Sequence, residues 1–142
     1  MTSRIFIIDT NVVAAALITG RPDSPTARIL DAMISGSLIY LLSADLLNEY
    51  RHVLLRPKLA RLHRLQPPEI EQILIELTAN AIWRDPPTDR AHHSPDPCDC
   101  HLWDLLASEP AAILITGDKL LIDNPGPQRS VISPATWIQT FR

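Results

Sequence analysis

Short apolar runs alternate along this chain with longer segments of helical periodicity. The clearest runs cover residues 5–8, 38–42 and 111–116. Each run is too short for a buried helix and is followed by a residue that ends a strand or caps a helix. Such runs are typical of strands that are buried on both faces, as in a parallel sheet. The alternation therefore predicts an α/β fold with a mainly parallel central sheet, and shorter strands are expected at 81–83 and 130–132.

The segments between these runs carry the start and stop signals of helices. Ser24 is suited to cap a helix that has Pro25 in its first turn, and Gly36 is suited to end that helix. Residues 69–80 place apolar side chains at the spacing i, i+3, i+4 and i+7, which indicates an amphipathic helix. Further helices are expected over residues 12–18, from Ser43 to about 55, from Pro57, over about 99–108 and from Ser133.

Length and composition bound the class of protein. The chain has 142 residues, which fits a single domain over 1–142, because domains usually hold about 100–200 residues. The net charge of −3 excludes a strongly basic nucleic-acid binder, although it allows a local basic face. No apolar run approaches the roughly 18 residues of a membrane span, and the N-terminus lacks the pattern of a signal peptide. We therefore expect a cytoplasmic protein that does not enter membranes.

Acidic residues recur where the predicted strands end. Asp9 directly follows the first strand, and Asp118 follows the strand at 111–116 after one glycine. Glu49 lies on the helix after the second strand, while Asp96 and Asp99 precede or open the helix that leads to the third. Ligands of such sheets bind outside the carboxyl ends of the strands. We therefore expect these acids to converge on one site.

Converging carboxylates repel one another. At about 4 Å and an effective dielectric constant near 20, two unit charges cost roughly 4 kcal/mol. Such a group is therefore either protonated or holds a cation. Carboxylate and water oxygens suit Mg²⁺ or Mn²⁺. A site of this kind can hydrolyse phosphodiesters, because it activates water and neutralises charge on the attacked phosphate.

Any one of these acids could instead simply cap the helix that follows it. Their order along the chain is more specific, and it resembles the PIN-domain family of nucleases, in particular a branch of toxins from toxin–antitoxin systems. The resemblance spans residues 5 to about 122. It rests on four motifs, which are Ile8-Asp9-Thr10-Asn11-Val12, Asn48-Glu49-Tyr50, Asp96-Pro97-Cys98-Asp99 and Ile115-Thr116-Gly117-Asp118-Lys119.

The resemblance implies a three-layer α/β/α sandwich and a ribonuclease that depends on Mg²⁺ or Mn²⁺. The toxin role, a cognate antitoxin as partner and a homodimer follow from the resemblance alone. So does the assignment of residues to the site. By position, Asp9, Glu49, Asp99 and Asp118 are the catalytic acids and metal ligands, Asp96 is a further metal ligand, and Asn11 and Thr116 support Asp9 and Asp118.

The third motif leaves two points open. Either Asp96 or Asp99 could contact the metal directly, and Asp99 is favoured because Leu102 and Leu106 anchor the helix that it opens. Members of this branch often have another acid directly after the position of Asp99, where this chain has Cys100. Because the four principal acids remain, activity is still expected.

Histidines and cysteines around this motif raise a zinc alternative. The usual zinc pattern joins a C-x₂₋₄-C pair to a second pair at a distance. This chain has a C-x-C pair and no second pair, so structural zinc is the weaker interpretation. The residues concerned are His92, His93, Cys98, Cys100 and His101.

A basic strip without acids lies between residues 51 and 64. It could be a solvated helix face, or it could follow the phosphates of an RNA strand beside the acidic site. We expect RNA as the partner, with Lys119 as a further phosphate contact. The strip contains Arg51, Arg56, Lys58, Arg61 and Arg64, together with His52 and His63.

A non-catalytic PIN-like module that binds RNA or a protein is the main alternative function. A phosphatase of the haloacid-dehalogenase type also starts with a strand that ends in aspartate. That chemistry needs a second aspartate two residues later, where this chain has Asn11. Metal-dependent cleavage of RNA would separate the nuclease from the binding module.

Overall fold

The central feature of the fold is a set of parallel strands. The computed structural model describes residues 4–86, 100–125 and 130–141. Its strands are β1 (Phe6–Ile8), β2 (Leu41–Leu42), β3 (Ile82–Trp83), β4 (Ile113–Ile115) and β5 (Ser130–Ile132). β4 pairs with β1 on one side and with β5 on the other, while β2 pairs with β3, and all these pairings are parallel. A parallel bridge between Phe6 and Tyr40 connects β1 to the β2–β3 pair.

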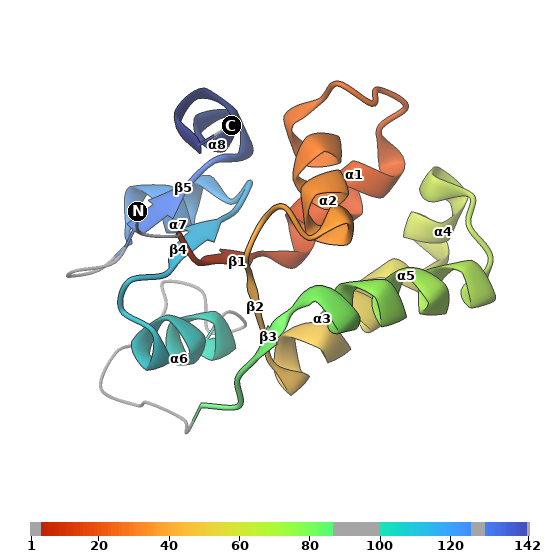
Figure 1. The fold of residues 1–142 in the computed structure, drawn as a ribbon. Coiled ribbons are helices and arrows are strands. Elements are labelled where there is room, and N and C mark those ends of the chain that lie inside the picture. Colours follow the sequence, from red (N-terminus) through yellow and green to blue (C-terminus); the bar gives the residue numbers. More distant parts are fainter. Residues whose placement is uncertain (1–3, 87–99, 126–129, 142) are drawn as a thin grey trace.

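The strands therefore follow the order β3-β2-β1-β4-β5 (Figure 1). From β1 the chain builds outward to β3 and then returns to β4 on the other side of β1. This reversal leaves a switch point between β1 and β4, and ligands of open parallel sheets bind beyond the carboxyl ends of the strands at such a point. The order confirms the predicted α/β fold with a parallel sheet.

Helices connect the strands, and several begin and end at the predicted signals. The Ser24 hydroxyl accepts a hydrogen bond from the Ala27 amide, and Gly36 ends the same helix with a left-handed φ of 80°. Ser43 caps the next helix by accepting from the Leu46 amide. The helices are α1 (Thr10–Ile18), α2 (Pro25–Ser35), α3 (Ala44–Leu54), α4 (Pro57–His63), α5 (Pro67–Asn80), α6 (Cys100–Ser108), α7 (Lys119–Asp123) and α8 (Pro134–Phe141).

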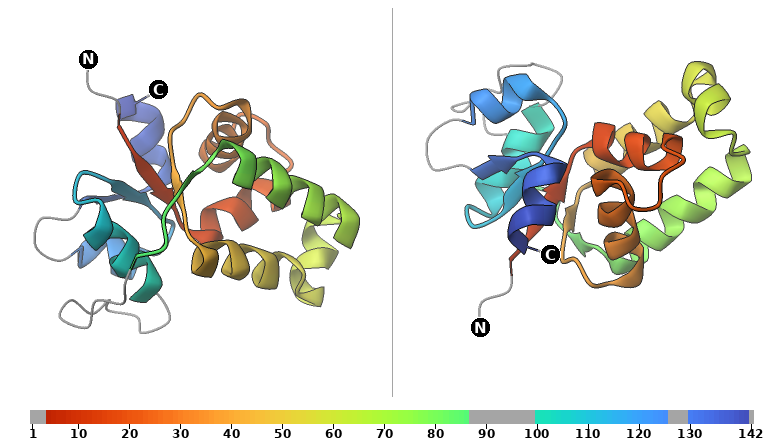
Figure 2. Two further views of the ribbon diagram at one scale, coloured as in Figure 1. Left: turned by 60° about the horizontal axis from the view of Figure 1, so that its bottom comes forward. Right: turned by 90° about the horizontal axis from the view of Figure 1, so that it is seen from above.

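Helices pack on both faces of the sheet. α2 contacts α8, whereas α3 contacts α6, and Figure 1 shows the first pair above β1 and the second pair below it. The two further views in Figure 2 show α4 at the end of the molecule away from β5. The arrangement is the α/β/α sandwich that the resemblance implied.

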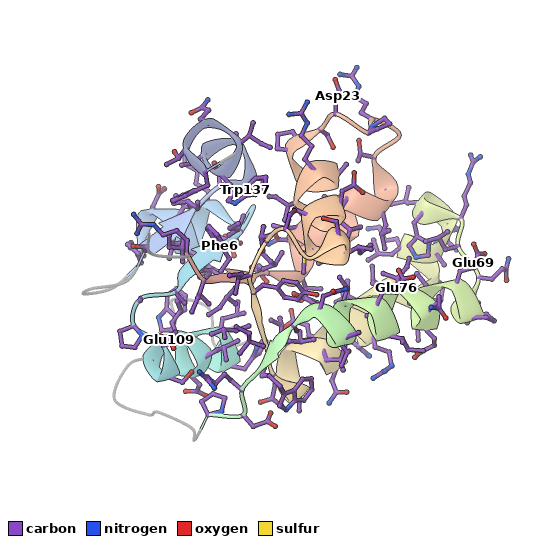
Figure 3. The ribbon with its side chains drawn as sticks, in the orientation of Figure 1. Phe6, Asp23, Glu69, Glu76, Glu109 and Trp137 are labelled. Atoms are coloured by element: carbon purple, nitrogen blue, oxygen red, sulfur yellow. The ribbon has the colours of Figure 1, made fainter. Side chains whose placement is uncertain are left out.

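The core lies between these layers. The side chains of β1 and β4 are almost completely buried, and the three aromatic residues Tyr40, Tyr50 and Trp103 are at most 2% exposed. Phe6 packs edge-on against Phe141 of α8, with ring centroids 5.3 Å apart. Figure 3 shows Phe6 beneath Trp137 of the same helix. α8 therefore covers the sheet through aromatic contacts.

Several boundaries differ from the sequence prediction. β2 and β4 are shorter than the apolar runs at 38–42 and 111–116, because regular pairing covers only part of each run. α5 begins at Pro67, two residues before the predicted start. Proline fits the first turn of a helix, whose amides have no partner within the helix, and Glu69 bonds back to the Gln66 amide as part of a capping box. Within the described ranges, no helix has the length and apolarity needed to cross a membrane.

Candidate functional site

Asp9 stands at the carboxyl end of β1, where the strand passes into α1. Its side chain is buried, at 4% exposure, and caps the helix by accepting a 2.7 Å hydrogen bond from the Thr10 amide. The other carboxylate oxygen accepts from the Thr116 hydroxyl at 2.8 Å and from the Asn11 amide at 3.2 Å. The carboxylate of Asp9 therefore has one fixed orientation at the switch point.

Asn11 and Thr116 join the ends of β1 and β4 around this carboxylate. The Asn11 side-chain amide lies 3.3 Å from Thr116 Oγ1, and its carbonyl oxygen accepts from the Gly117 amide at 2.9 Å. Thr116 Oγ1 also accepts from the Asp118 amide at 3.0 Å. The structure thus brings the two predicted supporting residues into direct contact with Asp9 and with the backbone of Asp118.

Glu49 approaches the same point from α3. The neighbouring residue Tyr50 is fully buried, and its hydroxyl donates to the Ile8 carbonyl at the end of β1. This bond fixes the second turn of α3 against the residue that precedes Asp9. Glu49 itself is half-buried, and its charge acts on Asp9.

His101 of α6 completes this part of the site, and sequence reasoning assigned it no role there. Its Nε2 forms a hydrogen bond with the Glu49 carboxylate. The zinc pattern drew attention to this histidine, but no local spacing indicates a contact with a residue 52 positions away. The sequence holds only a weak signal for this contact. His101 lies one turn before the buried Leu105, so it is on the side of α6 that faces the protein.

The environment shifts the pKa values of the two acids in opposite directions. Burial raises the pKa of Asp9, and the charge of Glu49 adds to this rise. The hydrogen bonds from Thr116 and Thr10 oppose it without cancelling it. Burial also tends to raise the pKa of Glu49, but the hydrogen bond and charge of His101, together with Thr10 and Arg56, outweigh it and lower that pKa overall. The pair therefore combines a buried acid that resists ionisation with one that ionises readily.

Asp118 lies just beyond β4 and caps α7. Its Oδ1 accepts a 2.9 Å hydrogen bond from the Leu120 amide, so the simple capping role applies to this acid. The side chain is only half-buried, and the next residue, Lys119, is exposed. Asp118 therefore stands at the same edge of the sheet as Asp9 with part of its carboxylate facing outward.

The third acidic motif cannot be placed in the same way. Asp96 and Asp99 lie outside the described residues, as does the side chain of Cys100. The choice between Asp96 and Asp99 therefore stays a prediction. His92, His93 and Cys98, which belong to the zinc alternative, also lie outside the described residues.

The described side chains include a pair of acids that could contribute to a metal site. Among them, no three His, Cys, Asp or Glu residues form a group that could hold a metal. The pair of Asp9 and Glu49 nevertheless fits a hard divalent cation, because burial raises the pKa of Asp9 and a cation would offset the repulsion from Glu49 that adds to this rise. The Thr10 hydroxyl lies close enough to Glu49 to help lower its pKa. It is a further oxygen donor beside the pair.

The basic strip divides into engaged and exposed side chains. Arg51 makes two hydrogen bonds to Glu71 of α5, at 3.0 and 3.3 Å, and so joins α3 to α5. The charge of Arg56 helps to lower the pKa of Glu49, which places this end of the strip within electrostatic reach of the acidic pair. The exposed members of the strip are His52, Arg56, Lys58, Arg61 and Arg64.

His63 does not belong to the exposed strip, contrary to the sequence prediction. It is 8% exposed, and its Nδ1 accepts from the Leu65 amide at 3.0 Å. The proton is therefore on Nε2, which donates to the Leu54 carbonyl at 2.8 Å. His63 holds the end of α4 against the end of α3, because both ring nitrogens bond to the main chain.

Comparisons with known proteins agree with this geometry. A family model described as PIN domain matches residues 6–120. This range contains all four motifs of the sequence analysis and every strand except β5. A search of curated proteins finds no match.

Proposed function

This chain belongs to the PIN domain family, and on that premise we propose that it is a metal-dependent endoribonuclease. PIN domains are generally nucleases and typically use divalent metal ions. The observation that carries the proposal is the buried Asp9 beside Glu49 at the switch point of the sheet. Two carboxylates have little structural reason to approach one another there, since each raises the cost of ionising the other.

The proposed reaction adds water across a phosphodiester bond of RNA and leaves a 5′-phosphate and a 3′-hydroxyl. Asp9, Glu49 and Asp118 would hold the metal, together with the predicted Asp96 and Asp99. A bound Mg²⁺ or Mn²⁺ would supply activation of the water and neutralisation of charge on the phosphate.

The chain's own residues provide the preorganisation that this chemistry needs. Thr116 and Asn11 hold the Asp9 carboxylate in one orientation, and His101 does the same for Glu49. Neither acid therefore has to reorganise when the charge on the phosphate develops. Arg56 acts electrostatically on Glu49, and Lys119 directly follows Asp118; both are exposed and would attract the RNA backbone.

The proposal extends from the reaction to the biological role of the protein. We propose that the protein is the toxin of a toxin–antitoxin system and acts on RNA in the cytoplasm. Its partners would be an antitoxin protein that blocks the acidic site and a second copy of the chain. The support for this level is the resemblance of the four motifs to that branch of the family.

Cleavage of a mixed cellular RNA pool tests the proposal. The purified protein should cut RNA with Mn²⁺ or Mg²⁺ and should not cut it in EDTA. Asp9→Asn should abolish cleavage, whereas Asp45→Asn should not, because Asp45 is an exposed acid on the same helix as Glu49. Cleavage that survives Asp9→Asn, or none with either metal, would contradict the assignment and favour a non-catalytic binding module.

A further inference from the structure

A hollow of about 430 Å³ lies where α3 turns into α4. Ligand pockets usually enclose about 300–1,000 Å³, so the hollow is large enough for a small planar group. Six residues from one stretch of chain line it, and five of them are exposed. They are Asn48, Arg51, His52, Leu55, Arg56 and Pro57.

Local backbone geometry explains why the hollow exists. Leu55 ends α3 in a helical conformation, and Arg56 then adopts an extended one, with φ −60° and ψ 135°. Residues before proline prefer this conformation, and Pro57 starts α4 in a new direction. The turn leaves Leu55 38% exposed at the bend. An apolar side chain is thus presented to solvent between two arginines.

The hollow lies close to the acidic site along α3. Residues three positions apart share a helix face, so His52 follows Glu49 along the same side of α3. Asn48 lines the hollow and is the direct neighbour of Glu49. Arg56 lies beyond the end of α3, but its charge helps to lower the pKa of Glu49. Three residues of helix cover about 4.5 Å. A group in the hollow would therefore lie within about one or two helical turns of the acidic pair.

The lining has the chemistry of a site for an unpaired nucleobase. Single-stranded nucleic acids bind through bases that stack on aromatic rings or guanidinium planes, while cations contact the backbone. The exposed imidazole of His52 and the side chains of Leu55 and Pro57 offer a surface for the faces of a base. Arg56 has no ion-pair partner in the described part of the chain and is available to a phosphate. Asn48 offers an amide to the edge of the base.

We infer that this hollow binds one unpaired nucleotide of the RNA strand, next to the phosphate that is cut. The inference rests on the proposed ribonuclease function, since it places a base beside that site. Such a hollow would select single strands over duplexes, because a base that is paired and stacked cannot enter it.

Binding measured without cleavage tests this subsite. A fluorescein-labelled single-stranded RNA of about eight nucleotides is titrated with the protein in EDTA, and anisotropy gives the affinity. His52→Ala and Arg56→Ala should each weaken binding about fivefold or more, as expected for the loss of one stacked base or its phosphate contact. Arg21→Ala is the matched control, because Arg21 is an exposed arginine outside both the basic strip and the hollow. It should change affinity less than twofold.

A second probe reports on the base itself. RNA that carries 2-aminopurine should change its fluorescence on binding, and His52→Ala should remove most of that change. Equal losses in the Arg21→Ala and Arg56→Ala variants, or equal affinity for a duplex of the same sequence, would overturn the subsite. Concentration-dependent dimerisation that Leu55→Ser abolishes, with unchanged RNA binding, would assign the hollow to a second copy instead.

The outcomes also separate this inference from the nuclease proposal. Wild-type protein that cuts RNA while the hollow variants bind normally would overturn the subsite alone. Loss of binding in the hollow variants, together with no cleavage under any metal, would support the subsite and contradict the nuclease.

Discussion

The Tyr50 hydroxyl donates a 2.5 Å hydrogen bond to the main-chain carbonyl of Ile8. Tyr50 directly follows Glu49, and Ile8 directly precedes Asp9. A single buried contact therefore sets how far the two carboxylates lie from one another. Burial raises the pKa of Tyr50 well above its usual range, so the hydroxyl keeps its proton and remains a donor.

Tyr50→Phe should therefore destabilise the fold and also leave Asp9 and Glu49 less firmly positioned relative to each other. Loss of a buried hydrogen bond typically costs about 1–3 kcal/mol, which we expect in the free energy of unfolding measured with urea. RNA cleavage should fall further than stability alone explains. Tyr40→Phe is the matched control, because Tyr40 is equally buried and donates to the Leu77 carbonyl away from the acids. It should destabilise the protein and leave the cleavage rate of the folded protein unchanged.

Asp9→Asn should make the metal-free protein more stable at neutral pH than the wild type. The folded state raises the pKa of Asp9, so the wild type loses stability as the pH rises from the unfolded value of 3.8 through the higher folded value. Asparagine caps a helix about as well as aspartate and does not ionise. Urea unfolding in EDTA between pH 4 and pH 8 should show an advantage of the variant that grows with pH. Mn²⁺ should reverse the order by stabilising only the wild type. Parallel stability curves in EDTA would refute this account of Asp9.

His101→Ala should shift the titration of Glu49 toward its ordinary range. The hydrogen bond and charge of His101 hold the pKa of Glu49 down against the effect of burial. The stability that Glu49 contributes is therefore present above its unfolded pKa and is lost as the pH falls through the folded one. NMR titration of the Glu49 carboxyl carbon in EDTA measures the change directly. His101→Gln keeps a hydrogen-bond donor and should give a smaller shift than alanine. An unchanged Glu49 titration in both variants would argue against the contact.

Arg56→Ala combined with Arg61→Ala should weaken RNA binding and reduce its dependence on salt. Each phosphate contact to a single strand contributes about 0.7 to the slope of log affinity against log salt, so the double variant should lower the slope by about 1.4. Anisotropy titrations between 50 and 300 mM salt give the slope. Arg21→Ala removes one exposed arginine before α2 and serves as the control. A slope that matches the wild type would exclude these two arginines as phosphate contacts.

Local signals in the sequence predicted most of the fold. Ser24 and Ser43 each cap the helix that they were expected to cap, because a cap depends only on residues within one turn. Asp9 and Asp118 lie at one edge of the sheet because they follow strands that became neighbours. The alternation of strands and helices was enough to place them there.

The contacts between distant elements could not be predicted in this way. The bond from His101 to Glu49 depends on how α6 packs against α3, and the bond from Arg51 to Glu71 depends on how α5 packs against it. His63 looked like one more exposed cation, yet its ring closes the corner between α3 and α4. The sequence shows that these charged and histidine side chains are present. Only the packing of the helices decides which of them reach the acidic site and which hold two helices together.

The pairing of β1 with β4 has a consequence for synthesis of the protein. The Thr116 hydroxyl that orients Asp9 is synthesised 107 residues after Asp9 itself. β1 also lacks its neighbouring strand β4 until then, so the growing chain contains Asp9 without the strand and the hydroxyl that hold its carboxylate in place. A translation product that ends before Thr116 therefore cannot form the hydrogen bond that orients Asp9.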